Sequence, residues 1–163
     1  MKSILIILLL VVSCFSEEIE GFRDLKWGDG PDKLGKFEVI EKNVNEKFFL
    51  YTKEKESLII GDVKLSSIEY GFFDNKLFIV LLNFSGEDNL RKIKKAFEAK
   101  YQIEWFRENR YIEHYFYSNK KVHISVECGS TYKKCNANIS NVELANKYIK
   151  YCDSVAKKGA KDL

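Results

Sequence analysis

The segment from Leu77 to Leu82 is apolar at every position and closely follows the turn-forming pair Asp74-Asn75. A strand without a polar side is typical of a strand that is buried on both faces, and therefore of one near the centre of its sheet. The Asp-Asn pair predicts a tight hairpin turn. In that register the facing residues lie on one side of the sheet: Phe72 with Leu77, Tyr70 with Ile79, and Ile68 with Leu81.

A second hairpin is predicted from Tyr111 to Cys128, around Asn119-Lys120. Pairing Ser118 with Lys121 sends alternate side chains to opposite faces. One face is apolar and continues into the following strand, so we assign it to the core: Tyr115, Tyr117, Val122, Ile124, Val126 and Cys128, then Cys135, Ala137 and Ile139. The other face carries His114, Phe116, His123 and Ser125.

Two helices are predicted on either side of this hairpin. Ser85 and Asp88 have the spacing of a capping box, which would open a helix that continues to Lys100. The second helix runs from about Asn141 to Lys157. Each has an apolar stripe at helical spacing: Leu90, Ile93, Phe97 and Tyr101 in the first, and Leu144, Tyr148, Tyr151, Cys152 and Val155 in the second. The expected fold is α+β, an antiparallel β-sheet meander packed against a middle helix and a C-terminal helix.

The N-terminal segment predicts export. Met1-Lys2 precedes an apolar run from Ile4 to Val12, and small residues follow before the acidic pair Glu17-Glu18. This order is typical of a secretory signal peptide. The run is about half of the roughly 20 residues needed to cross a bilayer, which disfavours a retained membrane span. We expect residues 1–16 to form the signal peptide and residues 17–163 to form a single domain, since no linker-like composition interrupts them.

Two processing routes compete at the end of this segment. Val11-Val12-Ser13-Cys14 resembles the lipobox of bacterial lipoproteins, although Val11 stands where Leu is usual. The resemblance implies that Cys14 becomes the acylated N-terminus and anchors the protein to a membrane of the bacterial cell envelope. The alternative is ordinary cleavage after Ser16, which would give a periplasmic or secreted protein.

A further resemblance begins after the signal peptide. Phe22, Arg23, Leu25, Trp27 and Gly28 resemble the F-R-x-[IL]-x-W-G opening of a group of uncharacterised bacterial exported proteins. The hairpin around Asp74-Asn75 is similar to one in that group, and the resemblance implies a short helix and a meander of strands but no activity. From the residues, we expect a strand over Phe22 to Trp27 and then a one-turn helix that Asp29 caps and Gly35 ends.

The cysteines predict one disulfide. Either processing route removes Cys14 from pairing, and Cys128, Cys135 and Cys152 all fall on core-facing positions. An exported protein meets oxidising conditions, so one bridge is expected. A short loop places Cys128 opposite Cys135, which favours that pair, with Cys152 as the competing partner.

The sequence offers one candidate metal site. In the predicted register His114 and His123 lie diagonally on one hairpin face, about 7–8 Å apart, and Glu127 shares that face. Two histidines and a carboxylate are a known ligand set for transition metals. Histidines on a half-exposed sheet face are more often solvated or packed against aromatic rings, so we expect no metal and no cofactor.

Other chemistries have little support. The chain lacks a G-x-S-x-G motif and a glycine-rich phosphate loop, and no Cys has a His neighbour in the predicted hairpins. Its 27 Lys and Arg against 24 Asp and Glu give a net charge of +3, too balanced for a nucleic-acid binder. The core does not account for Trp105, Phe106 and Phe116, which are candidates for a binding surface.

Two hypotheses follow from the sequence. The leading one is a lipid-anchored envelope protein that acts as a small non-catalytic binding or assembly module, with an unknown protein or small ligand as its partner. The alternative is an envelope enzyme of unassigned reaction type, metal-assisted through His114 and His123.

Overall fold

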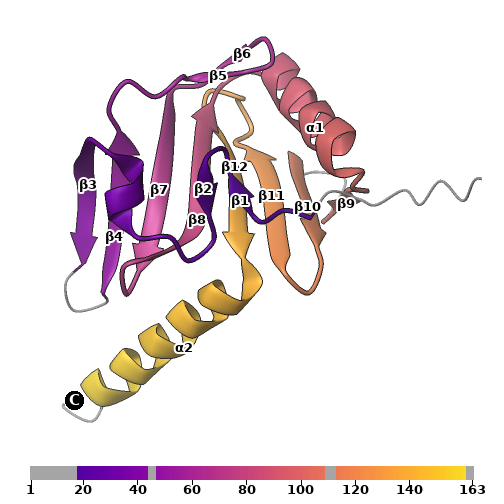
Figure 1. Ribbon diagram of the computed structural model, residues 1–163. Coiled ribbons are helices and arrows are strands. Elements are labelled where there is room, and N and C mark those ends of the chain that lie inside the picture. Colours follow the sequence, from indigo (N-terminus) through magenta and orange to yellow (C-terminus); the bar gives the residue numbers. More distant parts are fainter. Residues whose placement is uncertain (1–17, 44–46, 109–112, 161–163) are drawn as a thin grey trace, which may run out of the picture.

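The computed structural model describes residues 18–43, 47–108 and 113–160. An eight-stranded antiparallel sheet in the order β3-β4-β7-β8-β12-β11-β10-β9 forms its centre (Figure 1). The strands are β3 (Phe37–Asn43), β4 (Phe48–Lys53), β7 (Ser67–Phe73), β8 (Lys76–Phe84), β9 (Phe106–Arg107), β10 (Glu113–Ser118), β11 (Val122–Cys128) and β12 (Cys135–Asn141). Helices α1 (Glu87–Tyr101) and α2 (Val142–Gly159) accompany the sheet, which confirms the α+β fold.

The sheet consists of two meanders joined side by side. Strands β3, β4, β7 and β8 follow one another across one half, and α1 then carries the chain to the far edge, from which β9 to β12 return to pair with β8. Strand β8 therefore lies between β7 and β12 in the interior of the sheet, as its apolar sequence predicted. Leu77, Val80 and Leu82 are completely buried.

The register of the β7-β8 hairpin differs from the prediction beyond its first pairs. Phe72 faces Leu77 as expected, but the register then shifts by one residue, so that Tyr70 faces Val80 and Ile68 faces Leu82. The extra residue is Phe78, whose ring packs at 6.1 Å from Phe48 and 5.3 Å from Tyr148. This β-bulge reverses the alternation, because side chains alternate with a period of two. Ile79 and Leu81 therefore lie on the opposite face from the one predicted.

The β10-β11 hairpin has a longer turn than predicted. Ser118 pairs with His123 and not with Lys121, because the Asn119 side-chain oxygen accepts hydrogen bonds of 2.8 Å from the backbone N–H groups of Lys121 and Val122. The pairing is displaced by two residues. An even displacement leaves every side chain on its predicted face.

The N-terminal part of the described chain covers the core face of the sheet (Figure 1). Residues 21–26 form a tight hairpin of β1 (Gly21–Phe22) and β2 (Leu25–Lys26), where one strand over Phe22 to Trp27 was predicted. Arg23 makes the turn with a φ of 56°, which a single-strand prediction does not allow for. The short helix η1 (Pro31–Leu34) ends at Gly35 as predicted, but Asp29 accepts a hydrogen bond from the backbone N–H of Lys26 and does not cap it.

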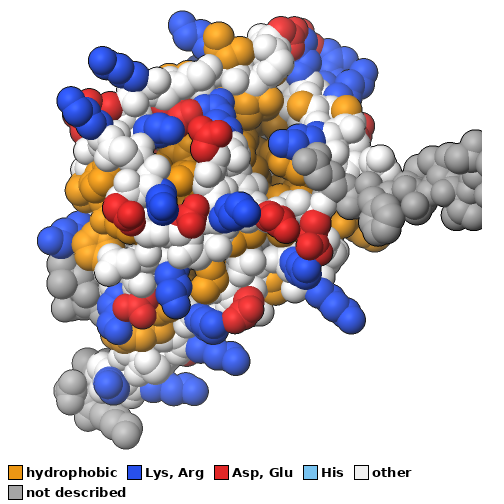
Figure 2. Space-filling view, viewed as in Figure 1, with side chains coloured by type: hydrophobic (Ala, Val, Ile, Leu, Met, Phe, Trp, Pro, Cys, Tyr) orange, Lys and Arg blue, Asp and Glu red, His pale blue; other side chains and the backbone are white. Residues whose placement is uncertain are grey.

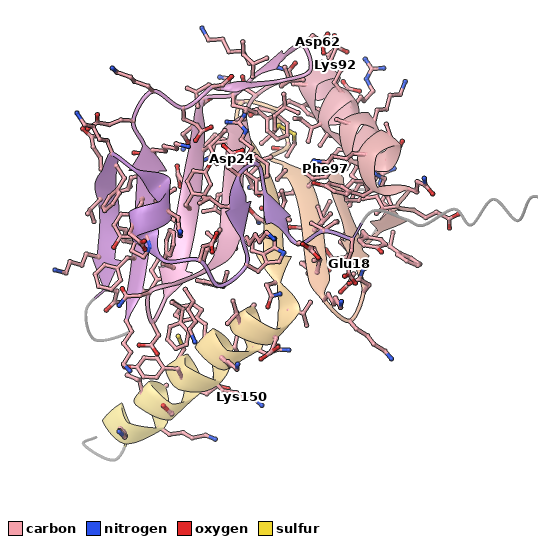
Figure 3. All side chains as sticks on the ribbon, in the orientation of Figure 1. Glu18, Asp24, Asp62, Lys92, Phe97 and Lys150 are labelled. Atoms are coloured by element: carbon pink, nitrogen blue, oxygen red, sulfur yellow. A yellow bond between two sulfur atoms is a disulfide. The ribbon has the colours of Figure 1, made fainter. Side chains whose placement is uncertain are left out.

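Helix α1 and a small ribbon complete the cover of the core face. The predicted α1 stripe is buried, but the helix begins after Gly86, whose φ is 93°, and Ser85 makes no cap. The ribbon consists of β5 (Ile59–Ile60) and β6 (Val63–Lys64), and an ion pair of 2.5 Å between Asp62 and Lys92 ties it to α1 (Figure 3). This pair lowers the pKa of Asp62, chiefly through the hydrogen bond from Lys92.

Helix α2 packs on the other face, at one end of the sheet. Asn141 caps it by accepting a hydrogen bond of 3.0 Å from the N–H of Leu144. Tyr148 packs against Phe48, Phe73 and Phe78. The predicted stripe is only partly buried, and α2 runs past the end of the sheet (Figure 1). Among the described residues, no helix packs over the part of this face formed by β10 and β11. We call the part of the face that α2 leaves uncovered the open face.

Candidate binding surface

The open face carries a row of polar side chains near one end of its strands. Ladder pairing aligns five neighbouring positions on five strands: Ser67, Asn83, Asn136, Glu127 and His114. The Asn83 amide donates to Ser67 and to Glu69, both at 2.8 Å, and the Asn136 amide donates to Glu127 at 2.9 Å. An antiparallel sheet commonly leaves one face solvated in this way. The row supplies amide, hydroxyl and carboxylate groups along a rigid surface.

Two stacked phenylalanines lie at the β9 end of this face. Phe106 pairs with Phe116 across β9 and β10, and their ring centroids are 5.8 Å apart at an interplanar angle of 26°. Phe106 is 64% exposed, more than any other large hydrophobic side chain in the described part of the chain. An apolar ring that is this exposed marks a candidate interaction surface.

Two histidines flank the same stack. The Phe116 ring lies 6.2 Å from the His114 ring and 6.3 Å from the His123 ring. His114 Nδ1 is 2.6 Å from a carboxylate oxygen of Glu108. Partial burial lowers the pKa of His123, and the nearby His114 lowers it further. The neutral form of His123 is thus favoured, and the strip formed by His114, Phe116, His123 and Phe106 is aromatic along its length.

The structure separates the third aromatic candidate from the other two. Trp105 packs edge-on against Phe97 of α1, with centroids 6.1 Å apart, and is partly buried against the core. Its indole nitrogen is buried and has no hydrogen-bond partner among the described residues. Trp105 therefore belongs to the covered side of the sheet, and the exposed stack consists of Phe106 and Phe116.

The three metal candidates do not form a ligand group. His114 faces Glu127 directly, but His123 faces Ser118, and Phe116 lies between the two histidines. The diagonal placement predicted from the shorter turn is therefore wrong. Within the described ranges, no three His, Cys, Asp or Glu side chains are placed to hold a metal ion.

The structure contains a disulfide between Cys128 and Cys135. These residues face one another at the ends of β11 and β12, with Cα atoms 4.1 Å apart. Cys152 is a free, partly exposed thiol on α2, which packs at the other face. The bridge closes the loop 129–134, and Tyr132 in that loop accepts a hydrogen bond of 2.7 Å from the backbone N–H of Gly86 at the start of α1.

Sequence reasoning missed most of the polar row. Asn136, Asn138 and Ser140 alternate with Ala137 and Ile139 along β12, so a two-residue period of polar groups was visible in the sequence. Nothing in the sequence indicated that Asn83 would lie beside Asn136, since this depends on the pairing of β8 with β12. The signal for the row was present within one strand only.

No family model, no curated protein and no solved structure matches this chain. The resemblance of residues 22–28 to exported bacterial proteins therefore stays a prediction. No helix in the described ranges has the length and apolar character needed to cross a membrane. Cys14 and the predicted signal peptide lie outside the described residues.

Proposed function

We propose that this protein is exported, anchored to the bacterial cell envelope by a lipid on Cys14, and acts as a non-catalytic binding module. The open face holds the partner, a protein or a small ligand. The observation that carries this proposal is the exposed Phe106-Phe116 stack beside a row of polar groups.

The composition of the open face supports binding. Covering a phenylalanine side chain removes apolar surface from water and contributes about 1.5–3 kcal/mol when burial is complete. Binding sites commonly combine such aromatic anchors with surrounding polar groups that fix orientation. Here the anchor is Phe106 on Phe116. Ser125 pairs with Phe116 across β10 and β11 and accepts a hydrogen bond of 3.3 Å from the Asn138 amide on β12.

The position of Cys14 supports the anchor. It closes the apolar run of the signal peptide and lies four residues before Glu18, the first described residue. Four extended residues span at most about 14 Å, so acylation of Cys14 would hold the domain close to the membrane surface. Each buried methylene of an acyl chain contributes about 0.8 kcal/mol, which makes attachment by more than one chain stable.

Fractionation of cells tests the anchor. Wild-type protein and the Cys152→Ser control are expected in the membrane fraction, while Cys14→Ser should move to the soluble fraction. The mass of the wild-type N-terminal peptide should show acylated Cys14. Soluble wild-type protein that begins at Glu17 would overturn the anchor and leave ordinary secretion as the correct interpretation.

A further inference from the structure

Two hollows adjoin between the β1-β2 hairpin, the β5-β6 ribbon and the second half of α1, on the covered side of the sheet. The smaller, of about 210 Å³, is walled mainly by apolar side chains: Phe22, Ile59, Ile60, Ala96 and Phe97. The larger, of about 380 Å³, follows the N-terminal segment from Glu18 to Gly21. Figure 2 shows hydrophobic side chains between the hairpin and α1, with Lys or Arg side chains beside them. We call the two hollows together the groove.

Positive charge lies where the two hollows meet. Arg23, Lys100 and Tyr101 line both of them. The Arg23 guanidinium is held in place by Glu56 and by the carbonyl oxygen of Ile59 at 3.3 Å. Lys100 lies 5.1 Å from the centroid of the Tyr101 ring and forms no ion pair with a described carboxylate. An unpaired ammonium group therefore stands beside an apolar hollow.

The acidic residues of the groove are already matched. Glu18 pairs with Lys121 at 2.5 Å, and Glu20 lies 3.9 Å from Lys26. Each of these carboxylates has a lysine of its own, so neither cancels Lys100. The groove thus combines an apolar compartment with a net positive opening, which matches a ligand that has an apolar chain and an anionic head.

We propose that the groove binds a single-chain anionic amphiphile of the fatty-acid type. The acyl chain lies in the hollow between Phe22, Ile60 and Phe97, and the carboxylate lies beside Lys100. The groove and its lining do not depend on the proposed lipid anchor or on the open face. The anchor adds only that Cys14 would keep the opening near a membrane, the natural source of such amphiphiles.

Titration with cis-parinaric acid, a fatty acid that fluoresces in apolar sites, tests the proposal on purified Cys14→Ser protein. We expect saturable binding that Ala96→Phe weakens at least about tenfold, because the new ring fills the hollow. Ala99→Phe is the matched control, since Ala99 is exposed on the same helix. Its affinity should equal that of the parent protein.

A charge variant tests the head-group contact. Lys100→Glu should weaken binding of the acid about tenfold or more but leave its methyl ester unaffected, while Lys95→Glu, at an exposed position of α1, should change neither. Because Lys100 is exposed, this variant should fold even where Ala96→Phe does not. Absence of saturable binding, or equal effects in the paired variants, would overturn the proposal.

The protein's own acyl chain is the competing occupant. If acylated wild-type protein fails to bind cis-parinaric acid while Cys14→Ser binds it, the groove holds the chain on Cys14 and the proposal of a free amphiphile is wrong. Equal binding by both proteins supports it. Neither result bears on the open face, so the two proposals fail separately.

Discussion

The hydroxyl group of Tyr70 donates a hydrogen bond of 3.0 Å to Glu56 and joins the buried centre of the sheet to the charged loop that follows β4. Burial raises the pKa of Tyr70 to about 12, so the hydroxyl remains a donor throughout the physiological range. Arg23 of the β1-β2 hairpin binds the same carboxylate, whose side chain is only 9% exposed. Glu56 thus fastens the N-terminal hairpin to the sheet.

Removing either the Tyr70 hydroxyl or the Glu56 carboxylate should destabilise the domain. Tyr70→Phe is expected to lower the free energy of unfolding by about 1.5–3 kcal/mol, the usual cost of losing a hydrogen bond to a charged group. Glu56→Ala should cost more, because it leaves both Arg23 and the Tyr70 hydroxyl without this acceptor. Urea denaturation measures both, with the exposed neighbour Glu54→Ala as a control that should change stability by less than about 0.5 kcal/mol. Equal stability of Glu56→Ala and Glu54→Ala would contradict this assignment.

The disulfide should contribute measurable stability in spite of its short loop. Replacing Cys128 and Cys135 together by serine is expected to cost about 2–3 kcal/mol, because closure entropy grows slowly with loop length. Cys152→Ser should have a small effect, since this thiol is free and only partly buried. Mass mapping of unreduced protein should link the peptides of Cys128 and Cys135. A linked Cys152 peptide would show that the pairing is wrong.

Stability should fall as the pH drops from 7 to 5, in part because of His123. Burial and then His114 lower its pKa in the folded protein, so the unfolded chain, with a pKa near 6.5, takes up the proton first. The contribution is complete above pH 6.5 and is lost as the pH falls through the folded-state pKa. His123→Gln should reduce this pH dependence, while Lys120→Gln in the adjoining turn should retain it. An unchanged profile in His123→Gln would exclude His123 as a cause.

Truncation of two phenylalanines should affect stability to very different extents. Phe106→Ala is expected to change the free energy of unfolding by less than about 0.5 kcal/mol, because the ring is 64% exposed. Phe97→Ala should cost about 3–5 kcal/mol of stability, since that ring lies on the buried face of α1. Thermal or urea denaturation of both variants checks the difference. A large loss in Phe106→Ala would mean that the stack is part of the core.

The sequence predicted faces better than registers. The prediction of which side chains of β10 and β11 face the core was correct, because the two-residue period of a strand does not depend on the turn. The register was wrong, because a hydrogen bond to the Asn119 side chain sets the length of the turn. In β8 the bulge at Phe78 depends on Phe48 and on Tyr148 of α2, which are distant in the sequence. These contacts could not be read from the hairpin itself.

Exposure explains a second gap in the prediction. Strand β3 was not predicted, because it lies at the edge of the sheet and neither of its faces is fully buried. Val39 and Ile40 are both more than half exposed, so the strand has no regular apolar side. The same limit affects the candidate site. Phe106 could be singled out as an unexplained aromatic residue, but its stacking on Phe116 required the pairing of β9 with β10.

Photocrosslinking in the native host tests the central claim, that the open face binds a partner. A photoreactive phenylalanine analogue is placed at position 106 in full-length protein, and the control position is Val39, at the opposite edge of the sheet and 52% exposed. We predict a discrete adduct from position 106 that is lost on Phe116→Asp, and none from position 39. Adducts from neither position, or equally from both, would contradict the assignment of the open face as the binding surface.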